Sequence, residues 1–421
     1  MRPPRLLLLG LLTVPVFWSA VHADPVADGE SPSWVDRWLQ GPGMTGDWFG
    51  TRTSLTALGV SPSITYLTDL QANVLGGLRK ASAYAGQLNV DLRFDMEKLA
   101  GLPGLSFDVS GNWASGSDLS NSIGNVFDVA QAFDGTEVRL YTLFLRQVLF
   151  ERRLDVKAGR FATGDDFLVG PSFVGLVNEA LNPRMTVVQI NVPGVTTGPN
   201  ATWGGRVIAR PTEALSVTAG AFYSDPRLDQ LTANGTEFAI DAGNGYFAIG
   251  EATYHLNQGT GATGLPGHYQ VGGYYDSNRF ASFTDPASQR RGNYGFYLTG
   301  EQMVFREVGA VSGQGLSVYG SVIYAPEQRI NAIPYFAEVA LGYQGLLPGR
   351  DSDVAAVALY YGGFSRYLPG QTYELTLEWT YALVVTPWLT IQPDIQYIVH
   401  PSGKSSVSNA LVVGVQLSLQ F

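Results

Sequence analysis

The sequence contains no cysteine, and charged residues make up only 15% of its 421 residues. The lack of cysteine excludes disulfide bridges, thiolate nucleophiles and cysteine-based metal sites. Basic residues number 26 against 36 acidic residues, so the chain lacks the basic surface that a nucleic-acid partner requires. The low charge, together with 50 glycines, 21 tyrosines and 21 phenylalanines, is typical of a barrel with an apolar exterior. A large soluble β-sandwich could share this composition.

Long apolar runs are missing from the chain after residue 23. A transmembrane helix needs about 20 consecutive apolar residues, and no later stretch approaches that length. In lipid the backbone is satisfied only in helices and closed barrels. Membrane residence of this part of the chain would therefore require a β-barrel.

The N-terminus has the pattern of a secretory signal peptide. Arg2 and Arg5 flank the start of an apolar run from Leu6 to Ala20, and the small-x-small sequence Val21-His22-Ala23 follows. This pattern predicts a Sec-type signal at residues 1–23, cleaved after Ala23. A membrane anchor is less consistent with this pattern, because the apolar run is too short to span a bilayer.

Residues 24–60 differ from the rest of the chain. Apolar residues between Ser33 and Leu39 recur at helical spacing, and 47–58 predicts a short helix that ends before Gly59. We expect this segment to be periplasmic and to precede a barrel at residues 61–421.

The last eleven residues, 411–421, alternate between large apolar residues and, from Gly414 onward, small or polar ones. The same two-residue period recurs in 88–96 and 373–381, with charged residues in the middle of the polar face. A sandwich core would not accept unpaired carboxylates there, whereas a water-filled lumen would. The pattern predicts an all-β fold, a 16-stranded antiparallel transmembrane β-barrel. Its predicted strands are 62–74, 87–97, 104–113, 136–150, 153–161, 201–210, 214–223, 245–256, 267–277, 292–304, 315–325, 335–345, 353–362, 371–385, 388–400 and 408–421.

The gaps between the predicted strands support this topology. Bacterial barrels have short periplasmic turns and longer extracellular loops, so long gaps should follow odd-numbered strands. The long gaps 114–135, 162–200, 224–244 and 278–291 all do so. The tight gaps 151–152, 211–213 and 386–387 follow even-numbered strands. Sixteen strands enclose an aqueous channel rather than a packed core.

Charged residues on the wet faces of the strands are candidate pore-lining groups. Arginine and carboxylate groups can bind polar solutes through paired hydrogen bonds. The alternative is that they pair across neighbouring strands and keep the lumen wet. The wall candidates are Asp91, Arg93, Asp95, Arg206, Arg210, Glu374, Glu378 and Asp394, of which Arg93 and Arg206 are the preferred solute-binding residues.

The longest gap, 162–200, supplies a second set of candidates. In large porins the corresponding loop commonly folds into the lumen and narrows it; the alternative is a solvated external loop. Its polar residues are Asp165, Asp166, Asn178, Glu179, Asn182 and Arg184. Trp203, beside this loop, could face the channel, whereas the other tryptophans and the tyrosines predict an interfacial girdle.

Several blocks of the sequence resemble the carbohydrate-selective outer-membrane porin family (OprB-type). Gly46-Asp47-Trp48-Phe49-Gly50-Thr51-Arg52 resembles the GDWxGxR opening of that family, and 158–167, 203–212 and 378–401 are similar to later blocks. Phe49 departs from the glycine that many members carry, and Ser402-Gly403 departs from the usual PGG. The resemblance implies a passive channel that prefers sugars such as glucose. The alternation of the strands alone predicts a porin, but it does not identify carbohydrates as the solutes.

We therefore expect passive diffusion of small hydrophilic solutes, without catalysis, cofactor or metal. The segment after residue 23 has three histidines, and no hydrolase or phosphate-binding motif appears. The alternatives are a porin for other solutes, or a structural or adhesin barrel plugged by residues 24–60. Expected partners are outer-membrane lipid, sugars, the barrel-assembly machinery, which would read Phe421, and possible homotrimer neighbours.

Overall fold

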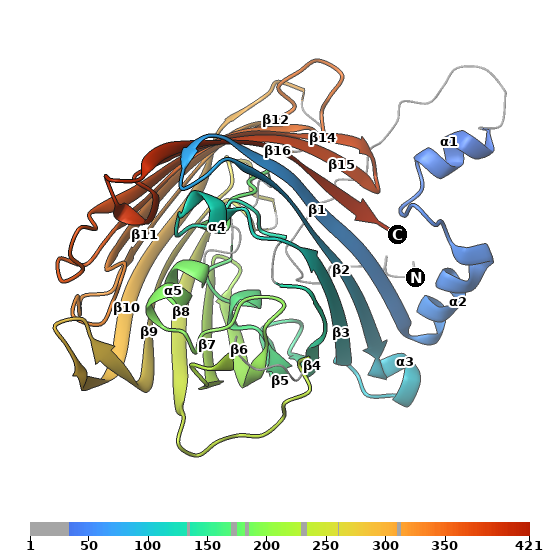
Figure 1. Cartoon of the computed structure of the whole chain (residues 1–421). Helices are drawn as coiled ribbons and strands as arrows, with labels where there is room; N and C mark the ends of the chain where they lie inside the picture. Colours follow the sequence, from blue (N-terminus) through green and yellow to red (C-terminus); the bar gives the residue numbers. More distant parts are fainter. Residues whose placement is uncertain are drawn as a thin grey trace.

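The computed structural model describes residues 33–132, 135–169, 175–181, 185–228, 234–259, 261–309 and 313–421. In these ranges sixteen strands form one closed barrel in which every strand pairs antiparallel with its sequence neighbours and β1 pairs with β16 (Figure 1). The strands are β1 Val60–Gly77, β2 Ala81–Asp95, β3 Leu105–Gly116, β4 Glu137–Leu149, β5 Leu154–Phe161, β6 Thr202–Thr212, β7 Leu215–Ser224, β8 Gly245–Leu256, β9 Gly267–Ser282, β10 Asp285–Arg306, β11 Gly315–Tyr324, β12 Tyr335–Gln344, β13 Val354–Gly363, β14 Tyr373–Thr386, β15 Leu389–Val399 and β16 Ser408–Gln420.

The predicted fold class is confirmed, and each predicted strand overlaps an observed one. The strands could be predicted from the alternation of apolar and polar residues, because lipid outside and polar groups inside impose a two-residue period on every strand. In β10, Leu298 is 55% exposed on the outer face whereas its neighbours Tyr297 and Thr299 are buried. Stacked tyrosine pairs such as Tyr324–Tyr335 form part of an aromatic girdle near the strand ends.

The predicted long loop at 278–291 is wrong. Strand β9 continues to Ser282 and β10 begins at Asp285, so the two strands extend as a hairpin. Residues 285–291 are all exposed. A hairpin beyond the lipid has no apolar face, and its strands therefore lack the alternation that predicted the others. The long connections after β3, β5 and β7 are observed.

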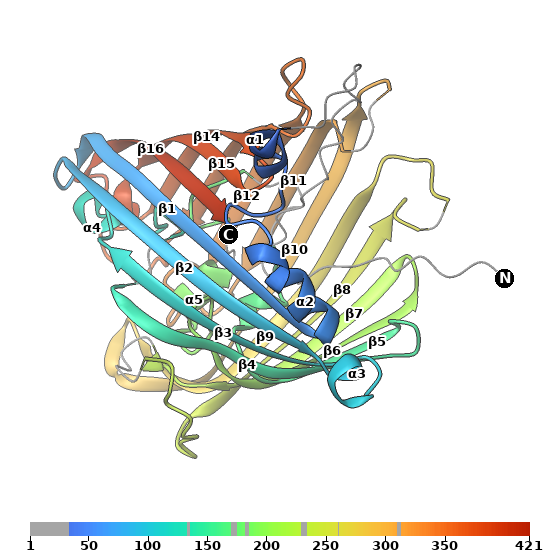
Figure 2. The same ribbon diagram turned by 90° about the vertical axis from the view of Figure 1, so that its right-hand side faces the viewer.

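The N-terminal segment lies outside the strands, beside the C-terminus (Figures 1 and 2). It contains α1 (Trp34–Leu39) and α2 (Thr51–Leu58). The Trp38 ring packs against Trp388 with 4.8 Å between ring centroids. The described part of residues 24–60 does not enter the lumen, so the alternative in which this segment plugs the barrel does not hold for that part. The predicted signal peptide lies outside the described residues.

Two long connections fold into the barrel instead. Loop 117–136 carries α4 (Ser120–Ile123), and loop 162–201 carries α5 (Met185–Asn191). Figure 1 shows both helices within the outline of the barrel. Apolar residues of loop 162–201 pack on the inner wall in a buried cluster that includes Phe167, Leu181, Val188, Phe222, Phe247 and Tyr274. Along the described residues, no helix is long and apolar enough to cross a membrane.

Candidate functional site

A row of ion pairs crosses the inner face of β2 to β6. Arg93 Nε lies 2.7 Å from Asp108 Oδ1. Further along the wall, the Asp155 carboxylate accepts from both Arg146 and Arg206, with N–O distances of 2.5 Å. These strands are neighbours in the sheet, and alternation turns their polar residues to the same face. We call Arg93, Asp108, Arg146, Asp155, Lys157 and Arg206 the charged wall.

Loop 162–201 docks on the charged wall through adjacent aspartates. The Asp166 carboxylate accepts hydrogen bonds from Lys157 Nζ and Arg206 Nε, each at 2.9 Å. Burial alone would raise the pKa of Asp166, but Lys157 and Arg206 together hold it below its usual value. Asp165 accepts from Tyr141 Oη, and burial raises its pKa. The predicted inward fold of this loop is therefore observed, and its first turn is fixed electrostatically.

Exposure separates residues that can meet a solute from residues that position others. The Arg93 and Asp165 side chains are 22% and 19% exposed, whereas Arg206 is only 1% exposed. Asp91 is half-buried on the same face of β2 and lies close enough to Asp165 to interact electrostatically. Asp91, Arg93 and Asp165 are therefore partly exposed on the inner side of the wall, and Arg206 is buried and holds the loop through Asp166.

The predicted carboxylates of β14 face inward, but the inner loops cover them. Glu374 accepts from the main-chain N–H groups of Val126, Phe127 and Ser402 at 2.6–3.1 Å. Its side chain is fully buried. Glu374 therefore attaches loop 117–136 to the wall.

Glu378 has the corresponding role for loop 162–201. It accepts from Val177 N at 2.6 Å and from Tyr360 Oη at 2.5 Å. Asp394, on the next strand, accepts from Gln396 Nε2 at 2.8 Å and is also buried. These side chains contact protein rather than open lumen.

Two predicted wall residues lie elsewhere. Asp95 accepts from Glu97 N and Lys98 N and caps α3 (Met96–Ala100) at a turn between strands. Arg210 donates to the Arg152 carbonyl oxygen at the end of the barrel. These placements correct the expectation for both residues, because each lies at a strand end where turn contacts replace the wall.

Trp203 faces outward rather than into the channel. It shares the outer face of β6 with the exposed Val207 and packs on Phe238, with 6.0 Å between ring centroids. Of the other loop candidates, Asn178 donates to Gln396 Oε1, and Glu179 N donates to the Asp128 carbonyl oxygen. Asn182 and Arg184 lie outside the described residues.

Two residues of the site, Tyr141 and Lys157, were not predicted from the sequence. Lys157 alternates with lipid-facing residues in β5 and could have been found by the same parity that found Arg206. Tyr141 could not, because a bulge shifts the register of β4 between Thr142 and Leu140. The bulge is what allows Tyr141 to reach Asp165.

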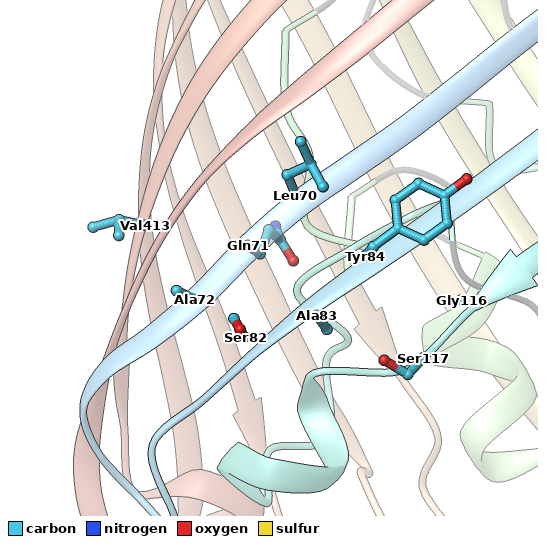
Figure 3. Close-up of a pocket in the computed structure, with 9 residues that line it drawn as sticks. All are labelled: Leu70, Gln71, Ala72, Ser82, Ala83, Tyr84, Gly116, Ser117 and Val413. Carbon is cyan, nitrogen blue, oxygen red and sulfur yellow. The ribbon is translucent and has the colours of Figure 1, made fainter.

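A pocket at the seam of β1, β2 and β16 belongs to the outer wall (Figure 3). Leu70 and Val413 in its lining are 47% and 37% exposed, as expected for lipid-facing residues. It is therefore separate from the lumen. Within the described ranges, no group of three or more His, Cys, Asp or Glu side chains could hold a metal ion.

The link between the two inner loops should depend on pH through Asp128. Burial, and then the charge of Asp118, raises the pKa of Asp128 to about 7. Because the packed loops favour the protonated acid, their contact is most stable below the ordinary pKa of about 4 and weakens as the pH rises through about 7. We expect current fluctuations in planar bilayers to increase across about pH 7, and Asp128→Asn to remove that step. Fluctuations in the unmodified protein that do not vary with pH would contradict this role.

The family comparison matches residues 79–421 to the model described as "Carbohydrate-selective porin, OprB family". Porin B of Pseudomonas aeruginosa is 27% identical over 449 aligned positions, covering 96% of this chain and 94% of that protein. The protein described as putative porin QuiX of Acinetobacter baylyi is 23% identical, covering 90% of this chain and 93% of that protein.

Solved structures show the same architecture. The high-pH structure of Pseudomonas putida OprB matches with a TM-score of 0.83 and 26% identity, covering 91% of this chain and 99% of that chain. The low-pH structure of that protein matches with a TM-score of 0.61 and 23% identity, covering 91% and 99%. The similarity to the low-pH structure shows a shared fold and nothing more.

Proposed function

This chain belongs to the OprB family of carbohydrate-selective porins, which are outer-membrane channels, and we propose that its lumen passes glucose-like monosaccharides by passive diffusion. No catalysis, cofactor or energy coupling is part of this proposal. The observation that carries it is the accessible group of Asp91, Arg93 and Asp165 beside the inner loops. Planar guanidinium and carboxylate groups of opposite charge can bind a polar neutral solute without favouring an ion of one sign.

Arg93 is the residue through which we test the proposal. Arg93→Ala removes the most exposed guanidinium of the charged wall and leaves the loop contacts of Arg206 unchanged. Losing one charge-assisted hydrogen bond costs about 1.5–3 kcal/mol, so glucose influx at low concentration should fall roughly 10- to 150-fold. Arg93→Lys keeps the charge but not the planar fork, and its influx should be intermediate.

Liposome swelling with glucose measures this influx. Equal amounts of each variant are reconstituted, and potassium conductance in planar bilayers controls for the number of open channels. Glucose influx that stays at the original level in Arg93→Ala would overturn the assignment of Arg93. A loss of conductance in parallel would indicate a folding defect, and Arg93→Lys then carries the comparison.

We also propose partners for assembly. Phe421 N donates to the Ile64 carbonyl oxygen at 2.9 Å, so the final aromatic residue lies at the β1–β16 seam. A terminal aromatic at this seam is suited to recognition by the barrel-assembly machinery, and homotrimers are the proposed oligomer. Deleting Phe421 should reduce the yield of assembled barrel more than the conductance per channel. Normal assembly of the truncated chain would exclude that role.

A further inference from the structure

The motif Gly46–Arg52 lies outside the charged wall and outside the matched range 79–421. We propose that segment 33–59 is an interfacial anchor: it docks on the rim of the barrel and lays exposed apolar residues on the inner leaflet of the outer membrane. The partner is the phospholipid interface. This inference requires the outer-membrane location and not the sugar selectivity.

The end of β16 holds the segment at the rim. Arg52 Nη2 donates to the Phe421 main-chain oxygen at 2.6 Å, and Met44 N donates to the Gln420 oxygen at 2.8 Å. The Arg52 guanidinium also lies over the Trp48 ring, 4.4 Å from its centroid. The motif is therefore attached to the closing strand of the barrel, whose outer face meets lipid.

The same contacts turn Phe49 outward. Asp47 accepts from Thr53 N and Thr53 Oγ1 at 2.8 Å and so holds the loop before α2 against the first turn of that helix. Directly after Asp47, the backbone takes positive φ at Trp48 (49°) and Phe49 (59°). Such conformations are unfavourable for bulky side chains, yet here they leave Phe49 fully exposed. The Phe49 ring is stabilised by nothing in the described fold, which indicates a partner outside the chain.

The apolar surface of α2 continues into the lipid-facing wall. Leu58 is 65% exposed at the end of α2. Lys98 Nζ donates to the Thr56 oxygen at 2.8 Å and holds α2 against α3, where Leu99 is 46% exposed. Strand β2, which leads into α3, carries Phe94 on its outer face. One apolar surface therefore extends from the wall to α2.

A neighbouring turn shows the same chemistry. Phe150 is 71% exposed between β4 and β5, and the following residues Glu151, Arg152 and Arg153 are exposed, with a net positive charge. Aromatic residues flanked by cations are typical of the boundary between acyl chains and phosphate headgroups. The rim around α2 thus matches a phospholipid surface in both polarity and charge.

The absence of cysteine makes a direct test possible. The variants Phe49→Cys, Leu298→Cys and Asn121→Cys are labelled with bimane and reconstituted in vesicles of phosphatidylethanolamine and phosphatidylglycerol. Leu298 lies on the lipid-facing wall, and Asn121 is exposed on α4 inside the barrel. Quenching is measured with lipids that carry a nitroxide near the headgroup or near the chain end, and with iodide in water.

We expect label at position 49 to lose as much fluorescence as label at position 298, but mainly with the headgroup-proximal nitroxide. Label at position 121 should be quenched by iodide alone. Quenching of position 49 by iodide and not by lipid would overturn the proposal. Protection from both quenchers would also overturn it, because it would place Phe49 against another copy of the chain. Phe49→Ser should leave conductance unchanged and lose only the membrane contact.

Discussion

Glu378→Ala is expected to convert the channel into one with frequent high-conductance states. The substitution leaves the Val177 N–H and the Tyr360 hydroxyl group without their shared acceptor in a buried site. Each unpaired buried polar group costs about 1–3 kcal/mol, so the two groups together make detachment of this part of loop 162–201 easier by about 2–6 kcal/mol. The population of detached loop should therefore rise by at least roughly 30-fold.

Single-channel recording in planar bilayers measures this effect. Glu378→Gln is the matched control, because its amide oxygen still accepts from Val177 N, and its current should remain near the original level. The main-chain hydrogen bonds that pair β14 with β13 and β15 do not depend on the carboxylate, so the β-barrel should remain intact in both variants. Identical current traces for Glu378→Ala and the unmodified protein would show that Glu378 does not hold the loop.

Arg206→Ala should release the first turn of the same loop and lower glucose selectivity. Arg206 is buried between Asp155 and Asp166, and its removal leaves two buried carboxylates with one partner each. Removing one member of a buried ion pair costs about 3–5 kcal/mol. Arg146 and Lys157 remain, so we expect about 3 kcal/mol. Asp165 would lose its fixed position near Asp91, and the glucose preference over a larger sugar should fall.

Arg210→Ala is the matched control for this variant. Arg210 lies on the same strand, but it donates to the carbonyl oxygen of a turn residue, Arg152. Its replacement should leave both conductance and sugar preference close to their original values. Equal selectivity losses in the two variants would mean that overall charge, and not the contact of Arg206 with Asp166, controls the passage.

The strands were predictable because lipid and water act on every residue of the wall. Leu411 to Phe421 alternates for the same reason as β10, and the parity of β14 correctly turned Glu374 and Glu378 inward. Parity specifies the face of a side chain but not what lies opposite. The partners of both carboxylates are main-chain N–H groups of distant loops, and such groups have no sequence signature.

The predictions failed where a local contact overrides the period of the strand. Asp95 continues the alternation of β2, yet its carboxylate caps α3. Tyr141 falls at a bulge, so strict alternation assigns its face wrongly. Trp203 lies beside the inner loop in sequence, but packs on Phe238 from the next long connection, 225–244. Each of these outcomes depends on a turn, bulge or loop that period-two reasoning does not describe.

The central claim is that the lumen passes monosaccharides by diffusion, and swelling of liposomes that contain the purified protein tests it most directly. Glucose and a disaccharide are compared at equal osmolarity, with protein-free liposomes as the reference. We expect rapid swelling in glucose, slower swelling in the disaccharide, and a glucose rate that falls in Arg93→Ala. Liposomes that swell in glucose no faster than protein-free liposomes, while the same preparation conducts potassium ions, would contradict the account.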